Sequence, residues 1–283
     1  MNVSFISTAE KRRAKPRGHQ RLLLKTLFSL MFLAAIGLGY VAVSINNQRR
    51  QKAAAEEIEK AGGGAEVEPT WLGKLLGDDS LVVVRGVGFL HPACRSITDD
   101  TLVHLEAMRQ LQYLRLTGTG ITDAGMAYLR NAKSLDVLWL DDTQITDAGL
   151  AHLQEMHELR VLSLQGTQIT DAGLAHLRGL RNMQILILSE TQITDAGLVH
   201  LRELKNLNTL ALDRTKIMDP GLENLAGLKD LRKLWLYDTE ITDAGLVYLR
   251  GLTKLGSIGL SGTLVTPKGK EELRQSLPNA EVF

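Results

Sequence analysis

Four histidines recur at equivalent places along the chain and are the first residues whose type and spacing suggest metal chemistry. They lie 24 or 48 residues apart: His104, His152, His176 and His200. Zinc ligands must converge to within about 4 Å of one another, because each Zn–N bond is about 2 Å long. Equivalent residues on packed neighbouring helices instead lie about 8–10 Å apart. We therefore expect no metal site in this column.

Six aspartates form a second column with the same spacing: Asp123, Asp147, Asp171, Asp195, Asp219 and Asp243. A calcium site needs several oxygen ligands clustered around one ion, and this column lacks such clusters. Most of these aspartates follow a threonine just before a leucine-rich stretch. Side-chain oxygens at such places cap the free N–H groups of a helix, and a carboxylate is favoured at the positive end of the helix dipole. Helix capping is the expected role.

Catalytic motifs are missing from the sequence. Cys94 is the single cysteine, which excludes an internal disulfide and a multi-cysteine metal site, and His91 is its nearest histidine. A lone cysteine is more often a small buried residue than a nucleophile. The chain contains no phosphate-binding glycine loop, no HExxH and no GxSxG. We predict that the protein is not an enzyme and uses no cofactor.

The elements that carry these columns are copies of one 24-residue unit. The segment ITDAG occurs at 121–125, 145–149, 169–173, 193–197 and 241–245, and altered copies begin at 97, 217 and 265. The consensus is LxxLxLxxTxITDAGLxxLxxLxx, and 51 of the 283 residues are leucine. A fixed period of this length is the signature of a repeat architecture.

This consensus resembles the leucine-rich repeat family, and within it the 24-residue TxITDAGL type common in bacterial surface and membrane-anchored proteins. The resemblance covers about residues 97–283, or about eight units. It implies an α/β fold, a curved solenoid with a parallel sheet on the concave side and helices on the convex side. It implies no particular ligand.

The residue pattern supports the same architecture. Leu138 and Leu140 are expected to point inward and Trp139 outward, as in a strand with one buried face. Leu150, Leu153 and Met156 then recur at every third residue, as on a helix. One unit cannot enclose its own apolar side chains, so stability has to come from stacking neighbouring units.

Two further columns have expected structural roles. Gly149 and its copies lie in the first helical turn despite the low helix propensity of glycine, so we infer a close approach between coils. Threonine hydroxyls are expected to bond backbone groups of the turns that would otherwise be buried without partners. The threonine column consists of Thr119, Thr143, Thr167, Thr191, Thr215, Thr239 and Thr263.

Both ends of the array depart from the consensus and are predicted to be caps. In the N-terminal cap, 70–96, we expect a short amphipathic helix over 71–76 that covers the first coil, and a strand over 81–84. In the C-terminal cap, 265–283, Val282 lies 24 residues after Ile258, at the fourth consensus position, and we expect a last, partial strand there.

The consensus leaves some strand positions free, and these are predicted to line the concave face. Aromatic residues on an exposed sheet favour a binding surface for a protein or peptide, although they also stack on neighbouring strands as cross-strand partners. The face mixes charges and lacks the basic stripe that nucleic-acid binding requires. The predicted partner-binding residues are Tyr113, Arg115, Trp139, Asp141, Val161, Ser163, Ile185, Ile187, Glu190, Asp213, Lys233, Trp235 and Tyr237.

The N-terminal region has the pattern of a membrane anchor. Residues 26–45 contain no charge, and 20 residues of helix span about 30 Å, the thickness of a bilayer core. Residues 1–25 hold seven Lys or Arg against one Glu, so we expect this tail in the cytoplasm and the repeats outside it. The alternative is a cleaved secretory signal, for which Ala42-Val43-Ser44 offers the small residues at positions −3 and −1 that cleavage needs.

Residues 46–69 are predicted to be a linker. Their first part has a helix-forming composition, and Gly62, Gly63 and Gly64 would form a flexible joint before the repeats.

These features favour a single-pass, membrane-anchored binding protein whose concave face recognises a protein or peptide without catalysis. One alternative is a structural envelope protein that associates with itself. Another is a substrate-recognition arm, since similar repeats occur beside F-box segments in ubiquitin-ligase adaptors. No F-box-like helical segment precedes the repeats here.

Overall fold

The computed structural model describes residues 41–89 and 97–283, and the chain divides into two units, Met1–Asn47 and Gln48–Phe283. Within the described residues, no helix is both long enough and apolar enough to cross a membrane. The basic tail 1–25 and the predicted membrane segment 26–45, apart from 41–45, lie outside this range, as do His91 and Cys94.

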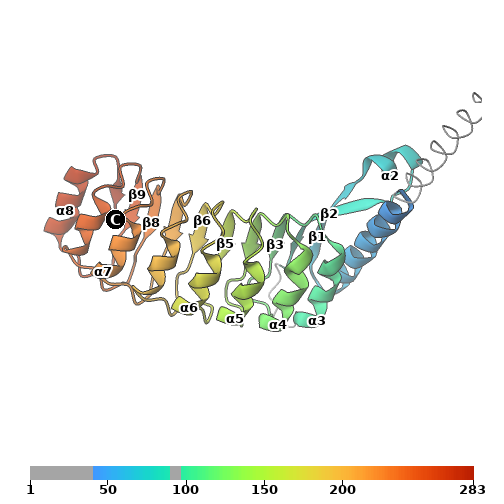
Figure 1. Ribbon diagram of the computed structural model, residues 1–283, viewed down its shortest axis with the longest axis horizontal. Helices are drawn as coiled ribbons and strands as arrows, with labels where there is room; N and C mark the ends of the chain where they lie inside the picture. The colour runs from blue at the N-terminus through green and yellow to red at the C-terminus, as the bar shows by residue number, and fades with distance from the viewer. Residues whose placement is uncertain (1–40, 90–96) are drawn as a thin grey trace, which may run out of the picture. The chain divides into compact units, whose positions relative to one another are not determined.

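The second unit is built on one sheet whose strands follow one another in chain order (Figure 1). Strand β1 (Gly64–Pro69) pairs antiparallel with β2 (Val82–Gly88), and all later neighbours are parallel. Val282 pairs with Ile258, which confirms the predicted last partial strand. The remaining strands are β3 Tyr113–Arg115, β4 Val137–Trp139, β5 Val161–Ser163, β6 Ile185–Ile187, β7 Thr209–Ala211, β8 Lys233–Trp235, β9 Ser257–Gly259 and β10 Glu281–Val282.

Short helical turns connect successive strands along the other side of the sheet (Figure 1). The α-helical turns are α3 Asp99–Leu102, α4 Asp123–Met126, α5 Asp147–Leu150, α6 Asp171–Leu174 and α7 Asp219–Leu222. The 3₁₀ turns are η2 Val103–Ala107, η3 Ala127–Asn131, η4 Ala151–Leu153, η5 Ala175–Leu177, η6 Gly197–Leu201, η7 Glu223–Leu225 and η8 Gly245–Leu249. The three-residue spacing of the consensus leucines matches the three residues per turn of a 3₁₀ helix. Helix α8 (Pro267–Ser276) belongs to the C-terminal cap.

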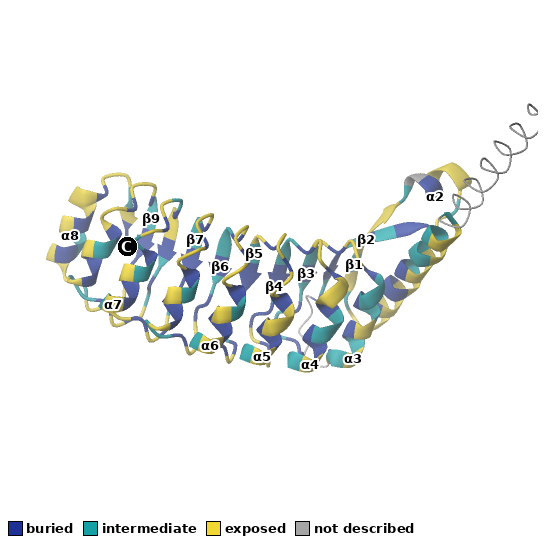
Figure 2. Ribbon diagram, viewed as in Figure 1, coloured by how far each residue is buried: buried dark blue, intermediate teal, exposed yellow. Residues whose placement is uncertain are grey.

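The core runs the length of the array between the sheet and the helical turns, as the dark blue ribbon in Figure 2 shows. In the unit from Leu159 to Leu180, every side chain predicted to point inward is fully buried. These residues are Leu159, Leu162, Leu164, Ile169, Leu174, Leu177 and Leu180. Each coil therefore shares its core with its neighbours, as the repeat pattern predicts.

The aspartate column links each coil to the next one. The Asp123 carboxylate accepts from the backbone N–H of Thr146 at 2.8 Å and from its hydroxyl at 2.5 Å. The threonine, rather than the aspartate, caps its own helical turn, because Thr146 Oγ1 accepts from the Ala148 N–H. A Cβ on Gly149 would lie 2.5 Å from Asp123 Oδ1, so glycine leaves the room that this carboxylate needs. The inferred close approach between coils is confirmed.

The threonine column bonds the turn that follows each strand. The Thr143 hydroxyl donates to the Leu140 carbonyl at 2.7 Å, and the same bond recurs in each of the seven coils. This is the predicted role, because the hydroxyl satisfies a carbonyl that is shielded from water.

Met218 stands where the other coils have the threonine that bonds to the aspartate column. Replacing it by threonine is expected to stabilise the array by about 1 kcal/mol. Asp195 accepts only from the Met218 backbone N–H, at 2.8 Å, because methionine has no hydroxyl. The measurement is the free energy of unfolding in urea. Met218→Val has the same branched shape without the hydroxyl, so equal stability of the two variants would contradict this explanation.

The segment predicted as a linker is instead part of the folded unit. Residues 48–60 are helical, and Ala54, Ala55 and Ile58 are buried in the core. The Gln51 side chain is 2% exposed and accepts from the Val84 N–H at 2.9 Å. This helix covers the start of the array, whereas the role was predicted for residues 71–76.

The glycines expected to form a flexible joint make a tight turn. Gly62 has a φ of 89°, a backbone conformation that favours glycine, and it ends the helix. A Cβ on Gly63 would lie 2.6 Å from a ring carbon of Phe89 and 2.8 Å from Ile58. Gly64 begins β1. The expectation of a flexible joint is therefore wrong, because Gly62 ends the helix and Gly63 packs closely against Phe89 and Ile58.

Candidate functional site

The candidate site is the sheet face opposite the helical turns, here called the open sheet face. Its outward side chains form two rows, because register partners on adjacent strands lie side by side about 4.8 Å apart. The first row is Tyr113, Val137, Val161, Ile185, Thr209, Lys233 and Ser257. The second row is Arg115, Trp139, Ser163, Ile187, Ala211, Trp235 and Gly259.

Arg115 and Trp139 form a pair near the N-terminal end of this face. Both side chains are half-buried, and the guanidinium carbon of Arg115 lies 5.6 Å from the centre of the indole ring, within cation–π range. Arg115 Nε and Trp139 Nε1 are both buried without a hydrogen-bond partner.

Trp235 and Tyr237 form a second aromatic pair near the C-terminal end. Their ring centres are 5.8 Å apart with an angle of 11° between the planes, and Phe283 lies 6.4 Å from Trp235. A Cβ on Gly259 would overlap the Tyr237 ring, so the ring lies flat against the neighbouring strand because glycine stands there. Trp139 and Trp235 are four strands apart, about 19 Å.

Between the aromatic pairs the face is apolar and half-buried. Val161, Ile185 and Ile187 keep part of their surface exposed there, and Tyr113 and Lys233 lie beside the two pairs. Two predicted binding residues are not available to a partner. Ser163 is 1% exposed, and Asp141 is 8% exposed because its carboxylate accepts from the Ser163 hydroxyl and from the Gln165 N–H. These two residues hold adjacent coils together.

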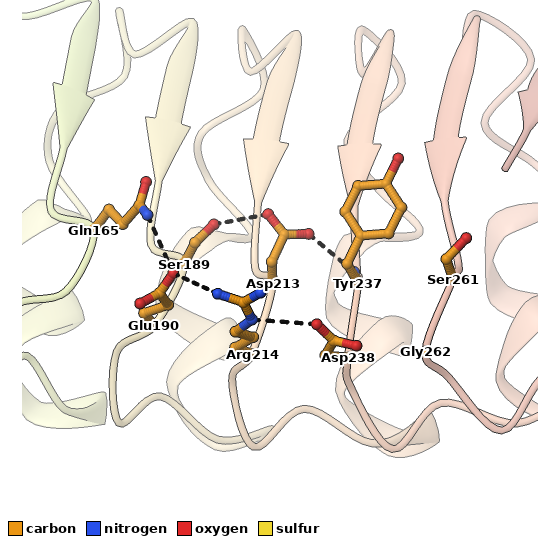
Figure 3. A pocket seen from close by; sticks show the side chains of 9 residues that line it. All are labelled: Gln165, Ser189, Glu190, Asp213, Arg214, Tyr237, Asp238, Ser261 and Gly262. Carbon is orange, nitrogen blue, oxygen red and sulfur yellow. Dashed lines mark hydrogen bonds and ion pairs between the residues drawn. The ribbon is translucent and has the colours of Figure 1, made fainter.

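A polar hollow of about 360 Å³ adjoins the face at the ends of strands β5 to β9 (Figure 3). Its half-buried Asp213 accepts from the Ser189 hydroxyl and from the Tyr237 N–H, both at 2.9 Å. Three of the predicted binding residues, Glu190, Asp213 and Tyr237, line it. The other lining residues are Gln165, Ser189, Arg214, Asp238, Ser261 and Gly262.

An exposed ion-pair ladder crosses this hollow (Figure 3). Arg214 pairs with Glu190 at 3.0 Å and with Asp238 at 3.2 Å. The hydrogen bond to Asp238 and the attraction of Glu190 raise the pKa of Arg214, so the guanidinium stays charged. The predicted set included Glu190 but omitted Arg214 and Asp238, which occupy the same position in the next two coils.

The three ladder residues and Asp142 share a backbone conformation that usually selects glycine. The same position is glycine in three coils, whereas Glu190, Arg214, Asp238 and Asp142 adopt φ values of 52–60°. A side chain in this region strains the backbone, and such strain is enriched at functional sites. A charged residue at a glycine position is the sequence signal that could have found these residues.

Asp142→Gly is expected to raise the free energy of unfolding by about 0.5–1 kcal/mol, because it removes this strain. Asp142→Ala keeps a Cβ in the same conformation and is expected to lower stability instead, since alanine tolerates it less well than aspartate. Thermal unfolding of both variants checks the sign of each change. A glycine variant no more stable than the alanine variant would contradict the strain.

The histidine column lies on the helical side and brings no ligand set together. His176 contacts the Gln154 amide through Nδ1, and residues 41–89 and 97–283 contain no group of three or more metal-ligating side chains.

Comparisons with known proteins agree with this architecture. The family model described as Leucine Rich repeat matches residues 108–129, 156–177 and 179–201. A search of curated proteins gave no match. An internalin C2 of Listeria monocytogenes is similar in structure, with a TM-score of 0.57 and 24% identity over 72% of this chain and 81% of that one. An internalin (inlF) of the same organism has a TM-score of 0.53 and 22% identity over 69% of this chain and 59% of that one. This chain thus carries leucine-rich repeats and folds as a leucine-rich-repeat solenoid.

Proposed function

We propose that the open sheet face binds a protein or peptide partner and that the protein acts by recognition rather than catalysis. The observation that carries this proposal is the half-exposed apolar surface between the Arg115–Trp139 pair and the Trp235–Tyr237 pair. Tryptophan, tyrosine and arginine are enriched among the residues that dominate binding energy at interfaces.

The charges on the face indicate which charges a complementary partner would carry. Arg115 is a half-buried cation at the N-terminal end of the face, and its guanidinium lies over the Trp139 ring. The edge of the face at the ends of the strands is acidic, with exposed Asp142, Glu190 and Asp238 against Arg214. A partner with a carboxylate near Arg115 and basic side chains along that edge would be electrostatically complementary.

Photocrosslinking in cells would identify the partner, and mutants would then test the surface. A benzoylphenylalanine at Ile187 should crosslink to it, whereas the same residue at Val199, 43% exposed on the helical side, should not. Trp139→Ala and Trp235→Ala are each expected to weaken affinity at least about tenfold while the fold is retained in circular dichroism. Val199→Ala is the matched control. Wild-type affinity in both tryptophan variants would reject this surface.

Membrane anchoring through residues 26–45 is part of the same proposal. Its support is the uncharged run, with more basic residues before it than after it. By the positive-inside rule this excess favours a cytoplasmic tail and repeats outside the cytoplasm. The full chain should resist extraction from membranes by alkaline carbonate and should be digested by protease added outside the cell. N-terminal sequencing of the mature protein checks the alternative, because a start after Ser44 would show a cleaved signal instead.

A further inference from the structure

Helix α2 (Trp71–Leu76) exposes two adjacent leucines. Leu75 is 71% exposed and Leu76 is 58% exposed, and no other neighbouring pair of large apolar residues in the described chain is exposed. The opposite side of the helix is fixed, because Leu72 is buried and a Cβ on Gly73 would lie 2.8 Å from the Leu81 carbonyl. Leu75 and Leu76 are therefore mostly exposed to solvent on the side of the helix that is not fixed by Leu72 and Gly73.

Both ends of α2 are bonded to the first residues of the unit. Thr70, which caps the helix, donates its hydroxyl to Gln48 Oε1 at 3.0 Å. Beyond the other end, Asp78 pairs with Arg49 at 2.9 Å, and Lys52 donates to the Asp79 carbonyl at 3.3 Å. Hydrogen bonds from Ser80 and Arg49 lower the pKa of Asp78 to about 2, so the carboxylate is ionised at neutral pH.

The first residues of the unit, to which α2 is bonded, are close in the chain to the uncharged run 26–45. Arg49 is four residues beyond Ile45, and four fully extended residues reach at most about 14 Å. The polar layer on each side of a bilayer core is about 5–7 Å thick. If residues 26–45 span a membrane, Arg49 and the residues bonded to it beside α2 are held near that layer by the chain.

We propose that α2 docks on the lipid bilayer, with Leu75 and Leu76 in the interfacial layer and Arg50 and Lys52 at the headgroups. Short apolar surfaces flanked by cationic residues suit this layer, where the leucines leave water and the charges remain hydrated. The proposal rests on the membrane anchoring proposed above. A second contact beside the anchor would fix the orientation of the repeats relative to the membrane.

Fluorescence of a labelled residue tests the contact in the full chain. Leu75→Cys in a Cys94→Ala background is labelled with the dye NBD and reconstituted in phosphatidylcholine liposomes. Its emission should shift to shorter wavelength and be quenched by lipids that carry a spin label near the headgroup. The matched site is Leu264→Cys, a leucine that is 64% exposed in the last coil. The bilayer contact is wrong if the two labels behave alike.

Two further measurements separate the contact from the anchor. Release of the full chain by carbonate overturns the anchor, whereas a retained chain with an unquenched label at position 75 overturns the contact alone. Residues 48–283 have their own core and both caps, so they can be tethered by a hexahistidine before Gln48 to nickel-chelating lipids. In this form the label at position 75 should again be quenched, and Leu76→Gln should reduce the quenching at least about twofold. Unaltered quenching in this variant would overturn the role of the leucine pair.

Discussion

Alanine at Gly149 is expected to lower the free energy of unfolding by about 2–4 kcal/mol. In an ordinary helical turn the same change stabilises by about 0.5–1 kcal/mol, so the expected sign is the reverse of helix propensity. The added Cβ would lie 2.5 Å from Asp123 Oδ1 and 2.9 Å from Ile145 Cγ2. It would push the carboxylate away from both donors of Thr146, and the link between two coils would be lost. Urea unfolding measures the effect.

The control is Gly179→Ala. No atom lies within 4 Å of a Cβ built on Gly179, and its φ is not in the left-handed region, so little change is expected. Equal stability of the two variants would show that the carboxylate moves aside without cost.

Ile58→Ala is expected to destabilise the N-terminal cap by about 2–4 kcal/mol, because it empties a fully buried site. A linker would show no such loss. Hydrogen exchange of residues 48–69 should accelerate in the variant, because the helix and β1 share this part of the core. Glu59→Ala changes the exposed neighbour and should leave exchange unaltered, so acceleration in both variants would indicate a general effect of helix composition.

The sequence predicts the array well because its period fixes the geometry. A strict 24-residue repeat leaves the same positions buried in every coil, so Leu162 and its copies could be assigned to the core and Trp139 to the sheet face from alternation alone. The final strand at Val282 follows from the same count.

The sequence predicts bonds between side chains poorly. Asp141 and Ser163 lie on the predicted side of the sheet, but alternation does not show that the hydroxyl of one meets the carboxylate of the other. The cap helix was missed for a related reason. Its buried stripe consists of Gln51, Ala54, Ala55 and Ile58, which have helical spacing but include one amide and two small residues. Such a stripe differs little in composition from an exposed helix.

The hydrogen bonds from the aspartate column to the next coil also make the number of coils adjustable. Each of these carboxylates bonds to residues of the following coil, so every junction repeats nearly the same chemistry. Duplicating or deleting one whole 24-residue segment between the two aromatic pairs would re-form the bonds from an aspartate to the backbone N–H of the next coil on either side of the change. It would alter the separation of the two aromatic pairs by one strand spacing, about 4.8 Å. Genetic recombination between copies could therefore tune the reach of this surface in fixed steps without redesigning its core.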